Sequence, residues 1–111
     1  METGYFWLSF DLGLKGDYQG LYAWLDTHEA SECGDNLAYI GKYQYSENLA
    51  IEVKRDLQSQ VNFKNTDRVY LIREESGNLR GMFIIGNRRK EYPWKGYGTV
   101  TTTTTEDGPG L

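Results

Sequence analysis

The chain contains few of the residues that usually carry metal or covalent chemistry. In 111 residues there is one cysteine, Cys33, and one histidine, His28. A single cysteine cannot form an intrachain disulfide, and one cysteine with one histidine falls short of the four ligands of a structural zinc site. A thiol nucleophile also needs a base and a third group that orients it, and the sequence supplies no such group. Zinc binding and cysteine-dependent catalysis are therefore not indicated.

Long apolar runs and phosphate-binding loops are missing as well. The mean hydropathy is -0.65, and no run approaches the roughly 20 apolar residues that cross a membrane. The start, Met1-Glu2-Thr3, has neither the basic nor the apolar region of a secretory leader. The spacing of Gly13, Gly16 and Gly20 matches neither the dinucleotide-binding nor the Walker pattern. These absences predict a cytoplasmic protein with no membrane partner.

What remains is the composition of one small domain. Apolar residues make up 39% of the chain, which is enough for one core at this length but not for two. The last stretch, TVTTTTTEDGPGL, is of low complexity and buries little. We therefore predict a single α+β domain over residues 1–98 and a Thr-rich disordered tail over residues 99–111.

Hydrophobic periodicity divides this domain into strands and helices. Alternating or aromatic-rich segments predict strands, and apolar residues that recur every three or four positions predict helices. The predicted strands are 5–12, 37–45, 68–73 and 79–85, and the predicted helices are 18–29 and 47–61. This order predicts a ferredoxin-like βαββαβ-type sandwich, with two helices on one face of a mainly antiparallel sheet and a final β-hairpin strand.

The face of the sheet that the helices leave uncovered is predicted to be rich in aromatic residues. Alternation in the first strand places Tyr5, Trp7 and Asp11 on this face, and alternation in the second strand adds Tyr39 and Tyr43. A large exposed aromatic patch on a soluble domain usually has a partner. We therefore predict that the four aromatic residues are binding residues and that the chain forms a homodimer through this face.

A second candidate site lies where cations alternate with aromatic residues near the C-terminus. Residues 68–95 hold seven Lys or Arg against three Asp or Glu, although the whole chain has a net charge of -4. Cations bind phosphates without reading sequence, and aromatic faces stack on unpaired bases. The residues predicted to bind RNA or single-stranded nucleic acid are Arg88, Arg89, Lys90, Tyr92, Trp94 and Lys95. The alternative is that Tyr92 and Trp94 anchor this segment to the sheet while the cations are solvated.

The first and third predicted strands carry a further signal. The segment Leu8–Leu12 is an aromatic strand that ends in an aspartate, LSFDL, and a long amphipathic helix precedes Thr66–Ile72, TDRVYLI. With a helix leading into the second strand, this layout resembles the small CRISPR-associated endoribonucleases and the related VapD toxins. The resemblance implies a ferredoxin-like dimer in which Asp11, with its symmetry mate, is a catalytic residue and a ligand of Mg²⁺. The alternative is that Asp11 closes the strand and caps the following loop.

Three functions stay open on the sequence. The preferred one is a small non-catalytic binding or regulatory domain that forms a homodimer and needs no cofactor. The first alternative is a metal-dependent endoribonuclease that uses Asp11 and Mg²⁺. The second alternative is a single-stranded nucleic-acid-binding domain that uses the sheet aromatics and residues 88–97.

Overall fold

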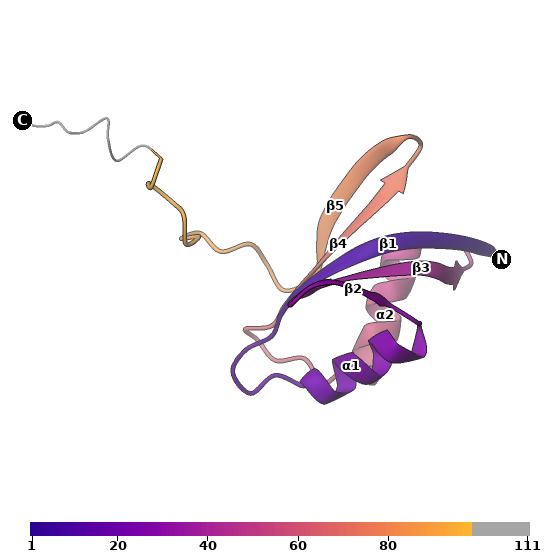
Figure 1. Ribbon diagram of the computed structural model, residues 1–111, viewed down its shortest axis with the longest axis horizontal. Coiled ribbons are helices and arrows are strands. Elements are labelled where there is room, and N and C mark those ends of the chain that lie inside the picture. The colour runs from indigo at the N-terminus through magenta and orange to yellow at the C-terminus, as the bar shows by residue number, and fades with distance from the viewer. Residues whose placement is uncertain (99–111) are drawn as a thin grey trace, which may run out of the picture.

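The computed structural model describes residues 1–98, and the tail predicted for residues 99–111 lies outside the described residues. Within residues 1–98 the chain forms two helices and five strands, so the α+β class is confirmed (Figure 1). In chain order the elements are β1 (Glu2–Asp11), α1 (Tyr18–Thr27), β2 (Ser31–Gly34), β3 (Leu37–Tyr45), α2 (Leu49–Gln60), β4 (Arg68–Glu75) and β5 (Asn78–Ile85).

The strands form one open antiparallel sheet with the order β2-β3-β1-β4-β5. Helix α1 connects β1 to β2 across β3, and α2 connects β3 to β4 across β1. Both helices lie on the same side of the sheet, and the hairpin of β4 and β5 projects away from them (Figure 1). The two edges of the sheet are β2 and β5. This arrangement is compatible with a ferredoxin-like fold.

Strand β2 is absent from the elements predicted by the sequence. It has only four residues, Ser31–Gly34, and all of them are exposed. A strand that buries nothing shows no apolar alternation, so periodicity cannot reveal it. The predicted hairpin turn, by contrast, is confirmed: Ser76 and Gly77 join β4 to β5 with φ angles of 54° and 83°, the positive values that a tight type I′ turn requires.

The core lies between the sheet and the two helices. Strand alternation directs Phe6 and Leu8 of β1 and Leu71 of β4 towards the helices, where all three are fully buried. Leu21 of α1 and Leu57 of α2 meet them from the other side. The fully buried apolar side chains are Phe6, Leu8, Leu21, Ile40, Val53, Leu57, Val69 and Leu71.

A carboxylate at each helix N-terminus accepts hydrogen bonds from nearby backbone N–H groups. Asp17 caps α1 and accepts hydrogen bonds from the N–H of Gly20, in the first turn, and from the N–H of Asn62, which follows α2, each at 2.9 Å. Glu52, in the first turn of α2, accepts from the N–H groups of residues 46–48 at 2.8, 2.8 and 2.9 Å. These hydrogen bonds lower the pKa of both carboxyl groups.

The prediction that Tyr43 shares the uncovered face with Tyr39 is wrong. In the pairing of β1 with β3, Gly4 lies opposite Tyr43 but Phe6 lies opposite Ile40, so β3 contains one extra residue at this point. This bulge reverses the alternation and turns Tyr43 towards the helices. Its side chain is buried, and its hydroxyl donates a hydrogen bond to the Asp56 carboxylate of α2 at 3.1 Å. Burial, followed by the charge of Asp56, raises the pKa of Tyr43.

The placement of Tyr43 is testable by removing its hydroxyl. Tyr43→Phe is expected to lower the free energy of unfolding by about 1 kcal/mol, because the half-buried Asp56 carboxylate loses a hydrogen-bond donor. Urea denaturation measures this change. Tyr39→Phe is the matched control on the other face and is expected to have little effect. Equal effects of the two substitutions would contradict the reversed alternation.

The helix-capping carboxylates predict a loss of stability in acid. Glu52 has a folded-state pKa below its ordinary value of 4.5, so its contribution is complete above that value and is lost as the pH falls through the lowered pKa. Glu52→Gln is therefore expected to lower stability at neutral pH and to flatten the decline between about pH 5 and pH 2. Thermal unfolding at a series of pH values measures this, with the exposed Glu32→Gln as control. A parallel decline in all three proteins would rule the linkage out.

Candidate functional site

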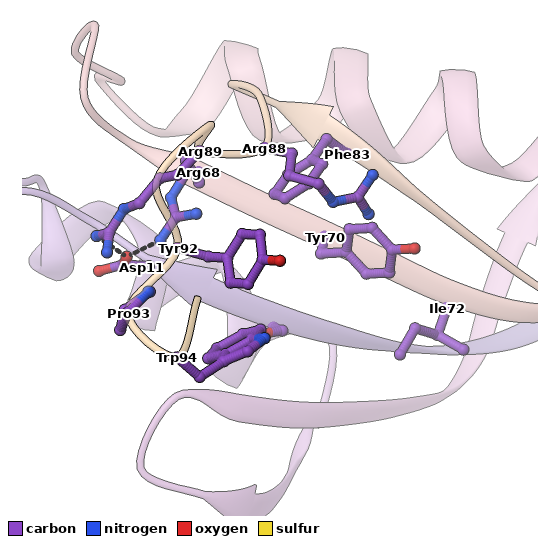
Figure 2. Close-up of a pocket in the computed structure, with 11 residues that line it drawn as sticks. Asp11, Arg68, Tyr70, Ile72, Phe83, Arg88, Arg89, Tyr92, Pro93 and Trp94 are labelled. Atoms are coloured by element: carbon purple, nitrogen blue, oxygen red, sulfur yellow. Dashed lines mark hydrogen bonds and ion pairs between the residues drawn. The ribbon is translucent and has the colours of Figure 1, made fainter. Parts of the chain in front are cut away.

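The candidate site lies on the sheet face that does not contact the helices, which we call the open face. It is a cleft of about 690 Å³ between the C-terminal ends of β1 and β5, the start of β4, and the C-terminal segment, residues 86–98 (Figure 2). Its lining consists of Ser9, Asp11, Arg68, Tyr70, Ile72, Phe83, Arg88, Arg89, Tyr92, Pro93 and Trp94.

The register of the sheet places the floor of this cleft. Asp11 lies opposite Arg68, Ser9 opposite Tyr70, and these side chains point away from the helices because their neighbours in each strand form the core. Tyr70 in turn lies opposite Phe83 of β5, and the two rings meet edge to face at 4.8 Å between centroids. Gly81 makes room for this arrangement, since a Cβ atom there would lie 2.6 Å from the Tyr70 ring.

The C-terminal segment forms the wall of the cleft. It leaves β5 at Gly86, whose φ of 73° and close approach to the backbone of Asp67 leave no space for a side chain. The rings of Tyr92 and Trp94 are 5.3 Å apart and line the cleft together, and Trp94 remains 71% exposed. The segment therefore presents aromatic faces to solvent beside the sheet rather than burying them.

Charge in the cleft is dominated by arginine. The carboxylate of Asp11 accepts hydrogen bonds from Arg68 and from Arg89, the latter at 3.3 Å (Figure 2). The guanidinium group of Arg88 lies 5.4 Å from the centre of the Phe83 ring and has no carboxylate partner among residues 1–98. Three guanidinium groups and one carboxylate thus line the cleft, so it keeps an excess of positive charge although the whole chain is acidic.

The alternative for Asp11, that it closes the strand and caps the following loop, holds only in part: Asp11 is the last residue of β1, but its hydrogen bonds go to arginines and not to the loop. Asp67 has that role: its buried carboxylate accepts from the N–H of Gly13 at 2.7 Å and from the N–H of Lys64 at 2.7 Å. Asp11 instead holds two arginines. Residues 1–98 contain no group of three or more His, Cys, Asp or Glu side chains that could hold a metal ion within one chain. A Mg²⁺ ion at Asp11 would compete with both arginines for the carboxylate.

Of the four aromatic residues predicted for the open face, three lie on it and Tyr43 does not. Tyr5, Trp7 and Tyr39 form an aromatic cluster with ring centroids 5.0 to 6.3 Å apart, but none of the three lines the cleft. Trp7 lies opposite Ile72, a cleft residue, so the aromatic cluster and the cleft adjoin along β1. Tyr43 lies in the core and belongs to neither.

The predicted basic residues also divide. Arg88 and Arg89 line the cleft, whereas Lys90 and Lys95 do not, and Lys95 pairs with Glu91 at 2.9 Å.

Arg68, Tyr70 and Phe83 are site residues that the sequence analysis did not identify. The available signal was their alternation with the core residues Val69, Leu71 and Ile84, which places them on the open face once the strands are paired.

At the far end of the open face the charge is of the opposite sign. The hydroxyl of Tyr5 donates a hydrogen bond to the carboxylate of Glu74, and this bond is the main cause of the raised pKa of Tyr5. Arg68 and Glu74 lie six residues apart on β4. Positive charge therefore lies at the cleft end of the open face and negative charge at the Tyr5 end.

No family model, no curated protein and no solved structure matches this chain. Among the residues that the structure describes, neither helix has the length and apolar character needed to cross a membrane.

Proposed function

We propose that this chain is a small non-catalytic binding domain whose open face binds single-stranded nucleic acid. The observation that carries the proposal is the cleft, which brings Arg68, Arg88 and Arg89 together with the rings of Tyr70, Tyr92 and Trp94. Guanidinium groups bind phosphate oxygens, and exposed aromatic faces stack on unpaired bases for about 1 to 3 kcal/mol each. A single strand offers both groups at once.

Single-stranded rather than double-stranded nucleic acid suits this cleft for two reasons. Bases in a duplex are already stacked on one another, so the exposed Trp94 ring would find no free base face. Duplex binders also rely on many phosphate contacts and usually have a basic domain, whereas this chain has a net charge of -4. A small cationic cleft with aromatic walls therefore favours a few unpaired nucleotides.

We also propose the finer fold assignment, a ferredoxin-like domain with one added strand. Support comes from the connections: each helix links two strands that lie on either side of a third, which gives two interleaved βαβ units. Strand β5 then extends the sheet beyond β4 through a tight hairpin. Such a sheet leaves one face free, and aromatic residues on the free face of a four-stranded sheet are a known way to stack RNA bases.

A second candidate is homodimerisation through the aromatic cluster, favoured because Tyr5 stays 38% exposed beside Trp7 and Tyr39. If the cluster joins two chains, the wild-type protein is a dimer at tens of micromolar, and Trp7→Glu yields a folded monomer because a charge is placed in the interface. Light scattering coupled to size exclusion measures both. A monomeric wild-type protein would eliminate this candidate and leave the cleft proposal intact.

The endoribonuclease function stays a prediction of the resemblance.

The unpaired arginine provides the direct test of nucleic-acid binding. Arg88→Gln is expected to weaken the binding of single-stranded RNA about three- to tenfold at low salt, and to reduce the slope of log K against log salt by about 0.7, because one phosphate contact is lost. Fluorescence titration measures affinity at several salt concentrations.

Lys90→Gln is the matched control, because it removes a neighbouring positive charge that does not line the cleft. It is expected to change the salt slope little. Equal loss with both variants would show that general charge, and not the cleft, attracts the strand, and no binding by the wild-type protein at low salt would reject the function.

A further inference from the structure

The open face carries its stacking surfaces in a definite order along β1. Nearest the group of Asp11, Arg68 and Arg89 are the rings of Tyr92 and Trp94 (Figure 2). Tyr70 and Phe83 follow at the level of Ser9, and the guanidinium group of Arg88 lies over the Phe83 ring. Beyond these, at Trp7 itself, come the rings of Trp7 and Tyr39, which are 5.0 Å apart.

This row of aromatic pairs has a limited length. From Asp11 to Tyr5, β1 advances six residues, which is about 20 Å at the rise of a strand. The row begins beside Arg68 and Arg89, passes Arg88 at the level of Phe83, and ends where the hydroxyl of Tyr5 donates a hydrogen bond to Glu74. A strand that follows the row therefore leaves cations behind and approaches a carboxylate.

Resting on the nucleic-acid function proposed above, we infer that the open face takes a short segment of two or three nucleotides and that Glu74 sets its limit. A phosphate of the segment lies by Arg88, whose guanidinium group lies over the Phe83 ring and has no carboxylate partner among residues 1–98. Bases stack on the successive aromatic pairs, up to Trp7 and Tyr39. A further phosphate would lie near the Glu74 carboxylate, which repels it.

The length of the bound strand distinguishes this inference from general single-strand binding. Titration of Trp fluorescence with 5′-phosphorylated oligouridylates of one to about eight nucleotides is expected to show affinity that rises up to about three nucleotides and then becomes constant. Trp7 and Trp94 both lie on the open face and report the contact. Affinity that keeps rising with length, or that is complete with a single nucleotide, would overturn the short-segment inference while leaving the cleft as a binding site.

Glu74→Gln tests what sets the limit. Glutamine can still accept the hydrogen bond from Tyr5, so the variant is expected to fold, and thermal unfolding checks this. Affinity for strands of about eight nucleotides is expected to rise two- to fivefold, about the effect of one exposed charge pair, with affinity for dinucleotides unchanged. Glu32→Gln, an exposed change on β2, is the matched control and should not alter either value. An unchanged length dependence in Glu74→Gln would overturn the role of Glu74, whereas no binding of any strand would overturn the proposed function as well.

Discussion

The buried carboxylate of Asp67 is the interaction on which the geometry of the site depends. A buried charge is costly unless hydrogen bonds satisfy it, and Asp67, only 1% exposed, accepts from the N–H groups of Gly13 and Lys64. These two bonds tie the loop after β1 to the turn before β4. Because β1 and β4 are held together at this point, Asp11 and Arg68 leave the sheet as neighbours. Gly86 packs against the backbone of Asp67, so the C-terminal segment starts from the same corner.

At the surface next to this corner, Asp11 holds two arginines of the cleft. Its carboxylate binds Arg68 of the sheet and Arg89 of the C-terminal segment. It therefore joins two parts of the chain that are 21 residues apart in the sequence. The same contact neutralises part of the positive charge of the cleft and leaves Arg88, over the Phe83 ring, as the cleft arginine without a carboxylate partner among residues 1–98. A single carboxylate thereby positions the cationic groups without cancelling them.

The sequence predicts the parts of this structure in which burial follows a regular period. The alternation of Phe6, Leu8 and Phe10 reveals β1 and its open face, and the spacing of apolar residues in 49–61 reveals α2. Three features escape it for physical reasons. Strand β2 buries no side chain, the bulge in β3 shifts Tyr43 by one position without leaving a mark in the residue types, and the path of residues 86–98 depends on long-range contacts that no local period encodes.

Half of the candidate site follows from the same reasoning. Arg88, Arg89, Tyr92 and Trp94 are identifiable as a cationic and aromatic group in the sequence, and the structure brings these four side chains into one cleft. Their partners on the sheet are not identifiable in this way, because Arg68, Tyr70 and Phe83 look like ordinary strand residues until the strands are paired. Asp11 stands out by its position at the end of β1, but its contact with Arg68 follows only from the strand register, and its contact with Arg89 only from the path of residues 86–98.

The edges of the sheet have a consequence for aggregation. Exposed strand edges can recruit strands of other molecules and grow into fibrils, and short edges, charged residues and bulges oppose this. Here β2 offers only four residues, while β5 carries Arg80 and its pairing with β4 is interrupted by a register shift between Val69 and Tyr70. A broad face of the sheet is therefore open, while each edge carries features that oppose the strand-by-strand growth of amyloid.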